Sequence, residues 1–303
     1  MLVREVFLTG ATGYVGRQIL RELLKERYNV RVLLRRGSEK KLPTSVEAVH
    51  IVYGDITDAN SLKSAEGGLA GCDAVIHLPG IIREMPSRGI TYELVHWQGA
   101  RNVIEAARAH NVRRFILMSA LGVRPDGVSE YQTTKYKAEQ YLQESGLDWT
   151  IFRPAVIFGH ENEGVANFTT VLESLVRRIP FVIPVIGDGE CQFQPVALDN
   201  VAQGVVKALK LPVTIGKVYE VAGPERYTYN QLIEIIARRL NVKKPKLHLP
   251  VWLMMFFASL FEQFEWFPVS RSQIRMLIEG TVSDNYETFF RDFAITPVLF
   301  HQT

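Results

Sequence analysis

Short apolar runs alternate with helix-like spacing along the first half of the chain. The apolar runs predict buried strands at residues 6–8, 30–34, 47–53, 74–78, 115–118 and 150–152. Between them, apolar side chains recur every three or four positions, as at Val15, Ile19 and Leu23, and predict further helices over about 99–110 and 131–144. This alternation predicts an α/β fold of the Rossmann type, a doubly wound parallel sheet with helices on both faces.

The rhythm changes beyond Pro154, where prolines and a Gly-Asp-Gly turn at 187–189 divide the chain into shorter pieces. We therefore expect a Rossmann domain over residues 1–155 and a smaller carboxyl-terminal α/β domain, for a substrate or a partner, over 156–303. Residues 195–210, a strand followed by a helix, are expected to return to the first sheet.

A glycine-rich loop lies between the first strand and the first helix. Gly10 permits a sharp turn, Gly13 leaves room for a pyrophosphate, and Gly16 lets the helix pack closely on the sheet. The amino terminus of the helix then offers N–H groups to the phosphates. A tight turn that binds nothing is the alternative, but the position between a strand and an amphipathic helix favours a dinucleotide. The cofactor-binding residues predicted here are Gly10, Thr12, Gly13, Tyr14, Val15 and Gly16.

The end of the second strand bears on the choice between NAD(H) and NADP(H). Sites selective for NAD place an acidic residue about 20 positions after the glycines, where it accepts a hydrogen bond from the ribose. In this chain Arg35 and Arg36 occupy that place, with no acid between Asn29 and Ser38. A guanidinium group can hold a 2′-phosphate through two hydrogen bonds, so NADP(H) is favoured over NAD(H). A solvated basic turn is the alternative.

Composition and charge exclude several other classes. Lys and Arg number 35 against 32 Asp and Glu, and this near balance without a long basic tract argues against nucleic-acid binding. Cys72 and Cys191 form no metal-binding spacing, so we expect reduced thiols and no metal site. The charged start of the chain and the lack of an apolar run of about 20 residues lead us to expect a cytoplasmic protein.

Longer segments carry a resemblance to a known family. The glycine spacing resembles the extended and atypical short-chain dehydrogenase/reductases. The segments "AVIHLPGII", "YQTTKYKAEQYL", "SGLDWTIFRPAVIFG" and "FQPVALDNVAQGVVKAL" look like the group related to the NADPH-binding accessory subunit of respiratory complex I. The resemblance covers about residues 3–260 and extends to epimerases and dehydratases.

The resemblance implies further cofactor contacts. Asp55 should lie beside the adenine with Ile56 packed on it, although a carboxylate that only caps a turn is an alternative for Asp55. The other residues implied to line the cofactor trough are Leu78, Pro79, Gly80, Pro154 and Val156.

Tyr131 and Lys135 lie four residues apart at the start of a helix, so they share one face. In the family this pair is catalytic: the tyrosine transfers the proton, and the lysine holds the nicotinamide ribose and lowers the pKa of the phenol. Ser119 would bind the substrate oxygen, but the family position could instead align with Ala120. His96 stands where many relatives have Asn, either as a proton relay or as a core residue whose ring nitrogens are satisfied.

Two main functions follow from these residues. The first is an NADP(H)-dependent oxidoreductase that acts on a carbonyl-type substrate. The second is a non-catalytic, NADP(H)-bound accessory or assembly factor of a respiratory complex, and a redox-sensing regulator is a third possibility. Segments 161–176 and 250–270 are expected to determine the substrate, whose identity the sequence does not give.

An apolar segment near the carboxyl terminus, residues 250–268, is too short to span a bilayer. It could cover the second core, dock on a protein partner or lie on a membrane surface. Core packing is the commonest outcome for such a segment. Glu262 and Glu265, rather than cations, accompany it, which argues against lipid binding. We nevertheless hypothesise that part of it forms an exposed apolar patch, with peripheral contact to a partner or a membrane.

Overall fold

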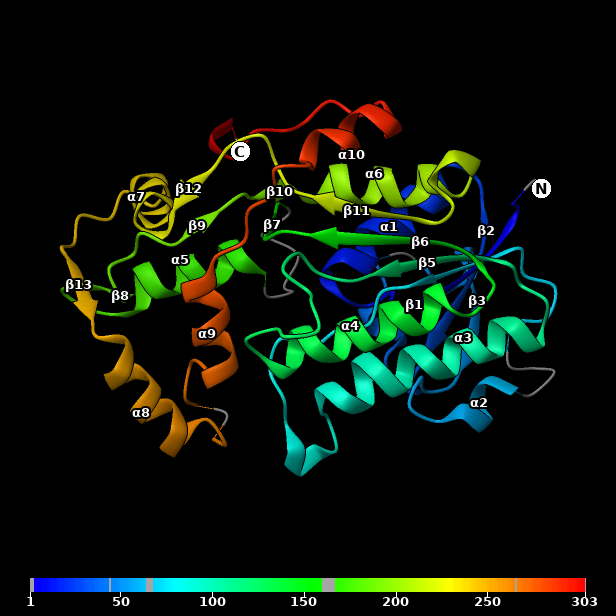
Figure 1. Cartoon of the computed structure of the whole chain (residues 1–303), viewed down its shortest axis with the longest axis horizontal. Helices are drawn as coiled ribbons and strands as arrows, with labels where there is room; N and C mark the ends of the chain where they lie inside the picture. Colours follow the sequence, from blue (N-terminus) through cyan, green and yellow to red (C-terminus); the bar gives the residue numbers. More distant parts are fainter. Residues whose placement is uncertain (1–2, 44, 64–67, 160–166, 265, 303) are drawn as a thin grey trace.

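A wholly parallel seven-stranded sheet lies at the centre of the computed structural model, which describes residues 3–43, 45–63, 68–159, 167–264 and 266–302 (Figure 1). The strand order is β11-β6-β5-β4-β1-β2-β3, which confirms the predicted Rossmann-type fold. Its strands are β1 Glu5–Thr9, β2 Asn29–Leu34, β3 His50–Tyr53, β4 Ala74–His77, β5 Arg114–Met118, β6 Asp148–Pro154 and β11 Lys217–Val221. The third strand is shorter than predicted, because Val46–Ala48 forms a 3₁₀ turn (η2) instead.

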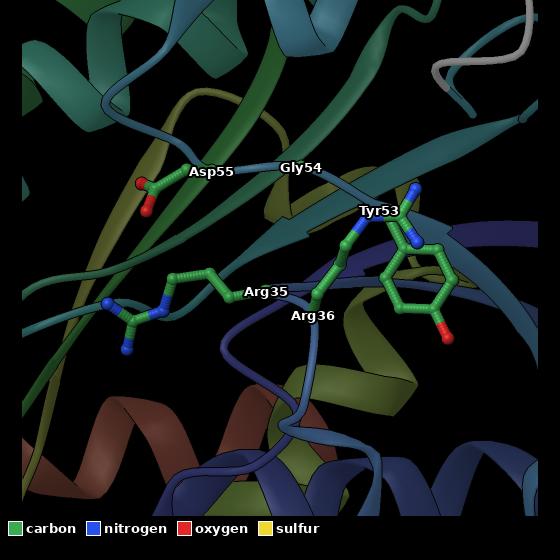
Figure 2. A pocket seen from close by; sticks show the side chains of 5 residues that line it. All are labelled: Arg35, Arg36, Tyr53, Gly54 and Asp55. Carbon is green, nitrogen blue, oxygen red and sulfur yellow. The ribbon is translucent and has the colours of Figure 1, made fainter.

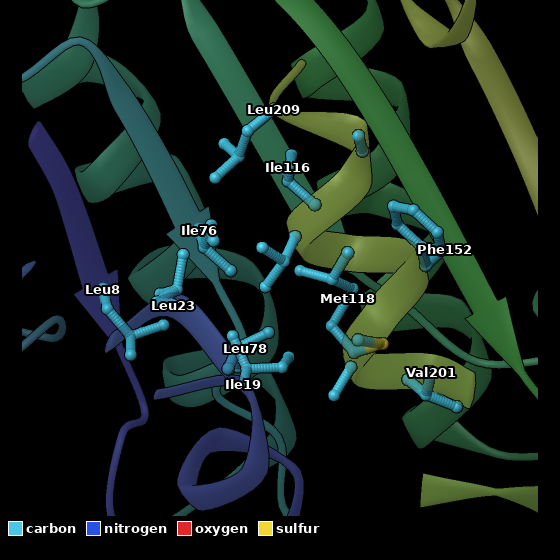
Figure 3. Close-up of a cluster of buried hydrophobic side chains, with 14 of the residues drawn as sticks. Leu8, Ile19, Leu23, Ile76, Leu78, Ile116, Met118, Phe152, Val201 and Leu209 are labelled. Atoms are coloured by element: carbon cyan, nitrogen blue, oxygen red, sulfur yellow. The ribbon is translucent and has the colours of Figure 1, made fainter. Parts of the chain in front are cut away.

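Helices cover both faces of this sheet, so successive residues of each strand enter different cores. Val6 and Leu8 contact the core under the first face, whereas Phe7 belongs to the core under the opposite face. Figure 3 shows side chains of the first core between the strands and the helices. The first face carries α1 Tyr14–Lys25, α6 Leu198–Ala208 and α10 Tyr286–Phe293, and the opposite face carries α2 Ala59–Lys63, α3 Gly99–Ala109 and α4 Glu130–Gln143.

A second, smaller core is built from residues beyond 155 and includes Leu172, Val185 and Ile233. It lies between two helices and three pairs of short strands. Its helices are α5 Phe168–Arg178 and α7 Tyr229–Arg239. Its strand pairs are β7 Ile157–Phe158 with β10 Val196–Ala197, β8 Ile183–Ile186 with β13 Lys246–Leu249, and β9 Gln192–Phe193 with β12 Tyr227–Thr228.

More elements from the second half of the chain belong to the first sheet and its covering helices than the sequence indicated. Within residues 195–210, α6 packs on the first sheet beside α1, but β10 pairs with β7 and not with that sheet. In addition, β11 pairs with β6 as the edge strand of the first sheet. The Tyr219 ring of β11 stacks on Phe152 and meets Phe293 of α10 edge-on, so aromatic packing attaches this distant segment to the sheet.

The apolar segment 250–268 forms α8 Val251–Phe261 and the turn that follows it, beside α9 Arg271–Glu279 (Figure 1). The expectation that this segment packs into the second core is wrong. Ala258 is the one buried residue of α8, and Trp252 is 71% exposed. The hypothesis of an exposed apolar patch is therefore confirmed for this segment. In the described part of the chain, no helix is both long enough and apolar enough to cross a membrane.

We predict that Gly16→Ala destabilises the fold by about 3 kcal/mol, because overpacking a close backbone contact forces the backbone to shift. A Cβ atom at Gly16 would lie 2.0 Å from the carbonyl oxygen of Gly10. The matched control is Gly13→Ala, whose Cβ would meet that same oxygen at an ordinary 3.4 Å, and which should cost about 1 kcal/mol or less. Urea unfolding without cofactor measures both, and equal losses would contradict the prediction.

Candidate functional site

The glycine loop lies against the end of β4, at the point where the strand order reverses between β1 and β4. Gly10 has a φ of +83°, and a Cβ atom there would touch Leu78 and Pro79 at 3.3 Å. The structure therefore brings together the predicted loop and the predicted trough at the end of β4. This crevice is where open α/β sheets bind their ligands.

The amino terminus of α1 is open toward this crevice. Gly13 is its N-cap and makes no side-chain cap, and no acidic residue lies in the first turn. The first N–H groups of a helix have no partner within the helix, so they are available to an anion. Among the described residues other than its chain neighbours, a Cβ atom at Gly13 would have the oxygen of Gly10 alone within 4 Å, which leaves space for a phosphate group beside it.

The other predicted residues of the loop are partly accessible. Thr12 is half-buried, and Val15 packs against the first core. The Tyr14 hydroxyl donates to the carbonyl oxygen of Gly159 at 2.5 Å, which ties α1 to the segment after β7. Tyr14 thus has a structural contact of its own at the edge of the cofactor crevice.

A shallow cavity of about 270 Å³ lies at the ends of β2 and β3, lined by Arg35, Arg36, Tyr53, Gly54 and Asp55 (Figure 2). The Arg36 guanidinium lies over the Tyr53 ring at 4.7 Å. Arg35 extends on the same side as Asp55 and is exposed, and no carboxylate of the described residues forms an ion pair with it. Its charge is therefore available to an anionic ligand.

The Asp55 carboxylate caps a turn, which was one of the two roles that the sequence left open for it. One carboxylate oxygen accepts from the backbone N–H and from the hydroxyl of Thr57, both at 2.9 Å. The next residue, Ile56, packs closely on Gly99, where a Cβ atom would meet it at 2.7 Å. Its carbonyl oxygen accepts from Asn102 at 2.8 Å, so the contact holds the end of β3 against α3.

The Tyr131 and Lys135 side chains lie together at the start of α4, whose N-cap is Ser129. The Lys135 ammonium is 5.7 Å from the centre of the Tyr131 ring and donates to the carbonyl oxygen of Met118 at 3.1 Å. It also approaches Gly80, where a Cβ atom would lie 3.3 Å from Nζ. The predicted pair is therefore joined to the ends of both β4 and β5.

Burial shifts the pKa of both groups. Loss of hydration lowers the pKa of Lys135 to about 8 and raises the pKa of Tyr131 to about 12. Tyr131 therefore does not show the lowered phenol pKa that the family resemblance implied. Desolvation outweighs the effect of the lysine, whose ammonium is directed to the Met118 carbonyl.

Two aromatic side chains form a wall beside Tyr131. Its ring meets the rings of His96 and Tyr92 edge-on, at 5.0 and 5.9 Å. Tyr92 was not predicted from the sequence, because no periodic pattern of apolar residues marks the segment before α3. Tyr92 is the N-cap of a π-helical turn, Glu93–Gln98 (η4), in that segment. The Tyr92 hydroxyl donates to the carbonyl oxygen of Ile82 at 2.9 Å, which fixes the ring.

His96 is a neutral core histidine and not a proton relay. Its Nε2 accepts from the N–H of Ile81 at 2.9 Å, and its Nδ1 lies 3.1 Å from the Thr134 hydroxyl. Burial lowers the pKa of His96 to about 2, so the ring carries no charge at neutral pH. The residue ties the loop after β4 to α4. His77, the last residue of β4, is likewise buried, and its Nδ1 lies 2.9 Å from the Thr9 hydroxyl.

Ser119 follows β5 and is buried, and its hydroxyl has no hydrogen-bond partner among the described residues. Buried polar atoms are normally paired, so an unpaired hydroxyl beside a crevice is a place for a ligand atom. The neighbouring Ala120 is more exposed but has no polar group. At the end of β6, Pro154 is buried and Val156 is half-buried. Residues 161–166 of the segment 161–176 that was expected to determine the substrate lie outside the described residues.

An ion pair between Glu139 and Arg153 lies one helical turn beyond Lys135. The sequence analysis did not predict it. Glu139, fully buried one turn further along α4, accepts from Nε of Arg153 at 2.9 Å. Its negative charge acts against the lowering of the Lys135 pKa. The spacing of four residues from Lys135 was a usable signal, because it places Glu139 on the same helix face.

We predict that Gly13→Val abolishes dinucleotide binding and leaves the fold largely intact. The new side chain would occupy the space of the pyrophosphate, whereas within the protein its Cβ would meet only the oxygen of Gly10. Fluorescence titration with NADPH measures the affinity, and circular dichroism reports the fold. Normal binding by a folded variant would mean that the loop is only a turn.

Comparison with known proteins gives a consistent answer. Residues 10–179 match the model of a family described as NAD(P)H-binding. The chain is 27% identical over 290 residues to the mitochondrial NADH-ubiquinone oxidoreductase 40 kDa subunit of Neurospora crassa, covering 95% of this chain and 74% of that protein. It is 30% identical over 247 residues to a ceramide reductase of Caulobacter vibrioides, covering 81% and 73%.

Solved structures agree on the fold. The UDP-glucose 4-epimerase of Thermotoga maritima superposes with a TM-score of 0.75 at 19% identity, covering 98% of this chain and 95% of that one. These relatives confirm the resemblance to the complex I-related short-chain dehydrogenase/reductases. The chain belongs to the NAD(P)H-binding family.

Proposed function

We propose that this protein is an NADP(H)-dependent oxidoreductase that reduces a carbonyl-type substrate. The observation that carries the proposal is the placement of Tyr131 and Lys135 together at the cofactor crevice. Ser119, with its buried and unpaired hydroxyl, would bind the substrate oxygen. A helix that only covered a sheet would have no need of a buried lysine at this point.

The protonation states suit reduction. When bound, the nicotinamide would supply a hydride to the carbonyl carbon. With a pKa of about 12, Tyr131 keeps its proton at neutral pH and can donate it to the carbonyl oxygen as the alcohol forms. With a pKa of about 8, Lys135 is mostly charged at neutral pH and can hold the nicotinamide ribose and stabilise the phenolate that is left.

The preference for NADP(H) rests on Arg35. The end of β2 has an exposed guanidinium where NAD-selective sites have a carboxylate. Asp55, the acid that lines the cavity, stands at the end of β3 and is engaged by Thr57. Arg36 is stacked on Tyr53, so Arg35 is the group better placed to reach a 2′-phosphate.

A second candidate is a protein that holds NADP(H) without turnover, as an accessory or assembly factor of a respiratory complex or as a redox-sensing regulator. Ala120, at the alternative position for the substrate-binding serine, supports it. So does the likeness to a subunit of NADH-ubiquinone oxidoreductase. Both candidates use the same cofactor residues and differ in whether a substrate is turned over.

We predict that the protein binds NADPH more tightly than NADH and that Arg35→Ala reduces this preference at least about tenfold. A hydrogen-bonded charge pair contributes about 1.5–3 kcal/mol, which is lost with the guanidinium. Titration calorimetry with both cofactors measures the effect, and NADH serves as the internal control because its affinity should not change. Equal affinities in the wild type would refute the proposed preference.

We predict that Tyr131→Phe removes turnover but keeps cofactor affinity, because it deletes only the transferable proton. Lys135→Ala should impair both. The assay is NADPH oxidation with a panel of aldehydes and ketones, alongside calorimetric titration of each variant. If no carbonyl substrate is turned over by the wild type while NADPH binds tightly, the accessory role is the better description. An unchanged rate in Tyr131→Phe would assign proton transfer to another group.

A further inference from the structure

Helix α8 lies at the edge of the molecule (Figure 1). This helix and the turn after it carry a set of exposed, large apolar side chains. Each is between 39% and 71% exposed. Monomeric proteins rarely leave so many neighbouring aromatic groups in water. We call this set the aromatic surface, and it consists of Trp252, Phe256, Phe257, Leu260, Phe264 and Trp266.

The aromatic surface is organised by the helix. Trp252, Phe256 and Leu260 are spaced by four residues, so they project from one face of α8. Beyond the helix, the rings of Phe264 and Trp266 stack at 6.2 Å. The surface is therefore a preformed layer, with a tryptophan near each end.

Its polar content favours lipid over protein. Ser259 is the one polar residue of α8, and its hydroxyl donates to the carbonyl oxygen of Phe256 at 2.7 Å. The other polar groups of the surface are the indole N–H groups of Trp252 and Trp266, which are few compared with the one hydrogen bond per about 100–200 Å² that protein interfaces carry. The apolar part of a bilayer requires none, and tryptophan is enriched at the membrane–water interface. With a length of about 16 Å, α8 can lie in that interface but cannot span the bilayer.

The charges beside the surface differ from what the sequence suggested. Glu262 is not a free acid, because it accepts from the backbone N–H of Arg271 at 2.8 Å and from Nε of the same residue at 2.6 Å. Glu279, at the far end of α9, forms an ion pair with Arg124. Arg271 and Arg275 are one turn apart on the exposed face of α9, and Arg275 has one contact, at 3.5 Å, with a backbone oxygen. The charge of Arg271 is therefore matched by Glu262, and Arg275 is the exposed cation of α9 that has no carboxylate partner among the described residues.

We propose that the aromatic surface docks on the surface of a lipid bilayer, with its rings at the level of the headgroups. Arg275, on the neighbouring helix α9, would then add an attraction to anionic headgroups. The inference is independent of turnover, since it uses none of the residues of the cofactor crevice.

Docking would also fix the orientation of the Rossmann domain relative to the membrane. Arg83, three residues after Gly80, donates to the carbonyl oxygens of Phe267, Glu262 and Phe264 at 2.6, 2.8 and 2.9 Å. These bonds hold the end of the aromatic surface to the loop that also contacts Tyr92. The crevice therefore has a defined position relative to the docked membrane.

The test is flotation of the full chain with vesicles of phosphatidylcholine alone and of phosphatidylcholine with phosphatidylglycerol. We expect the wild type to float with both, and more strongly with the anionic vesicles. The double variant Trp252→Gln/Phe256→Gln should bind at least tenfold more weakly to both. The matched control is Val213→Gln, which replaces an apolar residue that is 56% exposed far from α8 and should float like the wild type.

Affinity for NADPH, measured on each variant, verifies that the fold is retained. Flotation of the double variant at the wild-type level would overturn the proposal. So would binding to anionic vesicles alone that high salt abolishes, because the contact would then be only electrostatic. If the wild type does not float but dimerises in sedimentation, and the double variant does not, the surface binds a second copy of the chain and the proposal is wrong.

Discussion

The contact between the first turn of α1 and the end of β1 is the constraint on which the site depends. At Gly16 a single added carbon would lie 2.0 Å from the carbonyl oxygen of Gly10, so the helix can approach the strand only without a side chain there. This approach aims the helix amino terminus at the ends of β1 and β4. It thereby brings the N–H groups of α1, the Leu78–Gly80 segment and the Lys135 ammonium to one crevice. A larger residue at either glycine would separate the phosphate site from the place where hydride transfer would occur.

Burial then sets the chemistry of that crevice. Desolvation lowers the pKa of the buried Lys135 to about 8, and the negative charge of Glu139 offsets part of this effect. Tyr131 has no such support and remains a neutral phenol. The same low-polarity surroundings make His96 an uncharged strut between the loop after β4 and α4. Three titratable groups in one cluster therefore have three different roles, which their hydrogen-bond partners and burial decide.

Much of this arrangement could be predicted from local sequence. Strands buried on both faces appear as continuous apolar runs, and the glycine spacing identifies the phosphate loop. Features that depend on distant partners could not be predicted. The edge strand β11 is added through contacts of Tyr219 with Phe152 and Phe293, and no pattern within residues 217–221 specifies its neighbour. The sequence left both core packing and exposure open for Trp252 for a related reason: an apolar helix has the same sequence whether or not another element covers it.

The loop after β4 connects the two regions for which we propose functions. Ile81 and Ile82 hold His96 and Tyr92, which form the wall beside Tyr131, while Arg83 holds the end of the aromatic surface. A guanidinium that donates to three carbonyl oxygens at once fixes its segment more firmly than a single bond would. The position of Tyr131 relative to a docked bilayer is therefore set by a few residues of one loop. An enzyme that meets its substrate at a membrane and an accessory protein that holds NADP(H) beside one would both need this connection, so the loop serves either function.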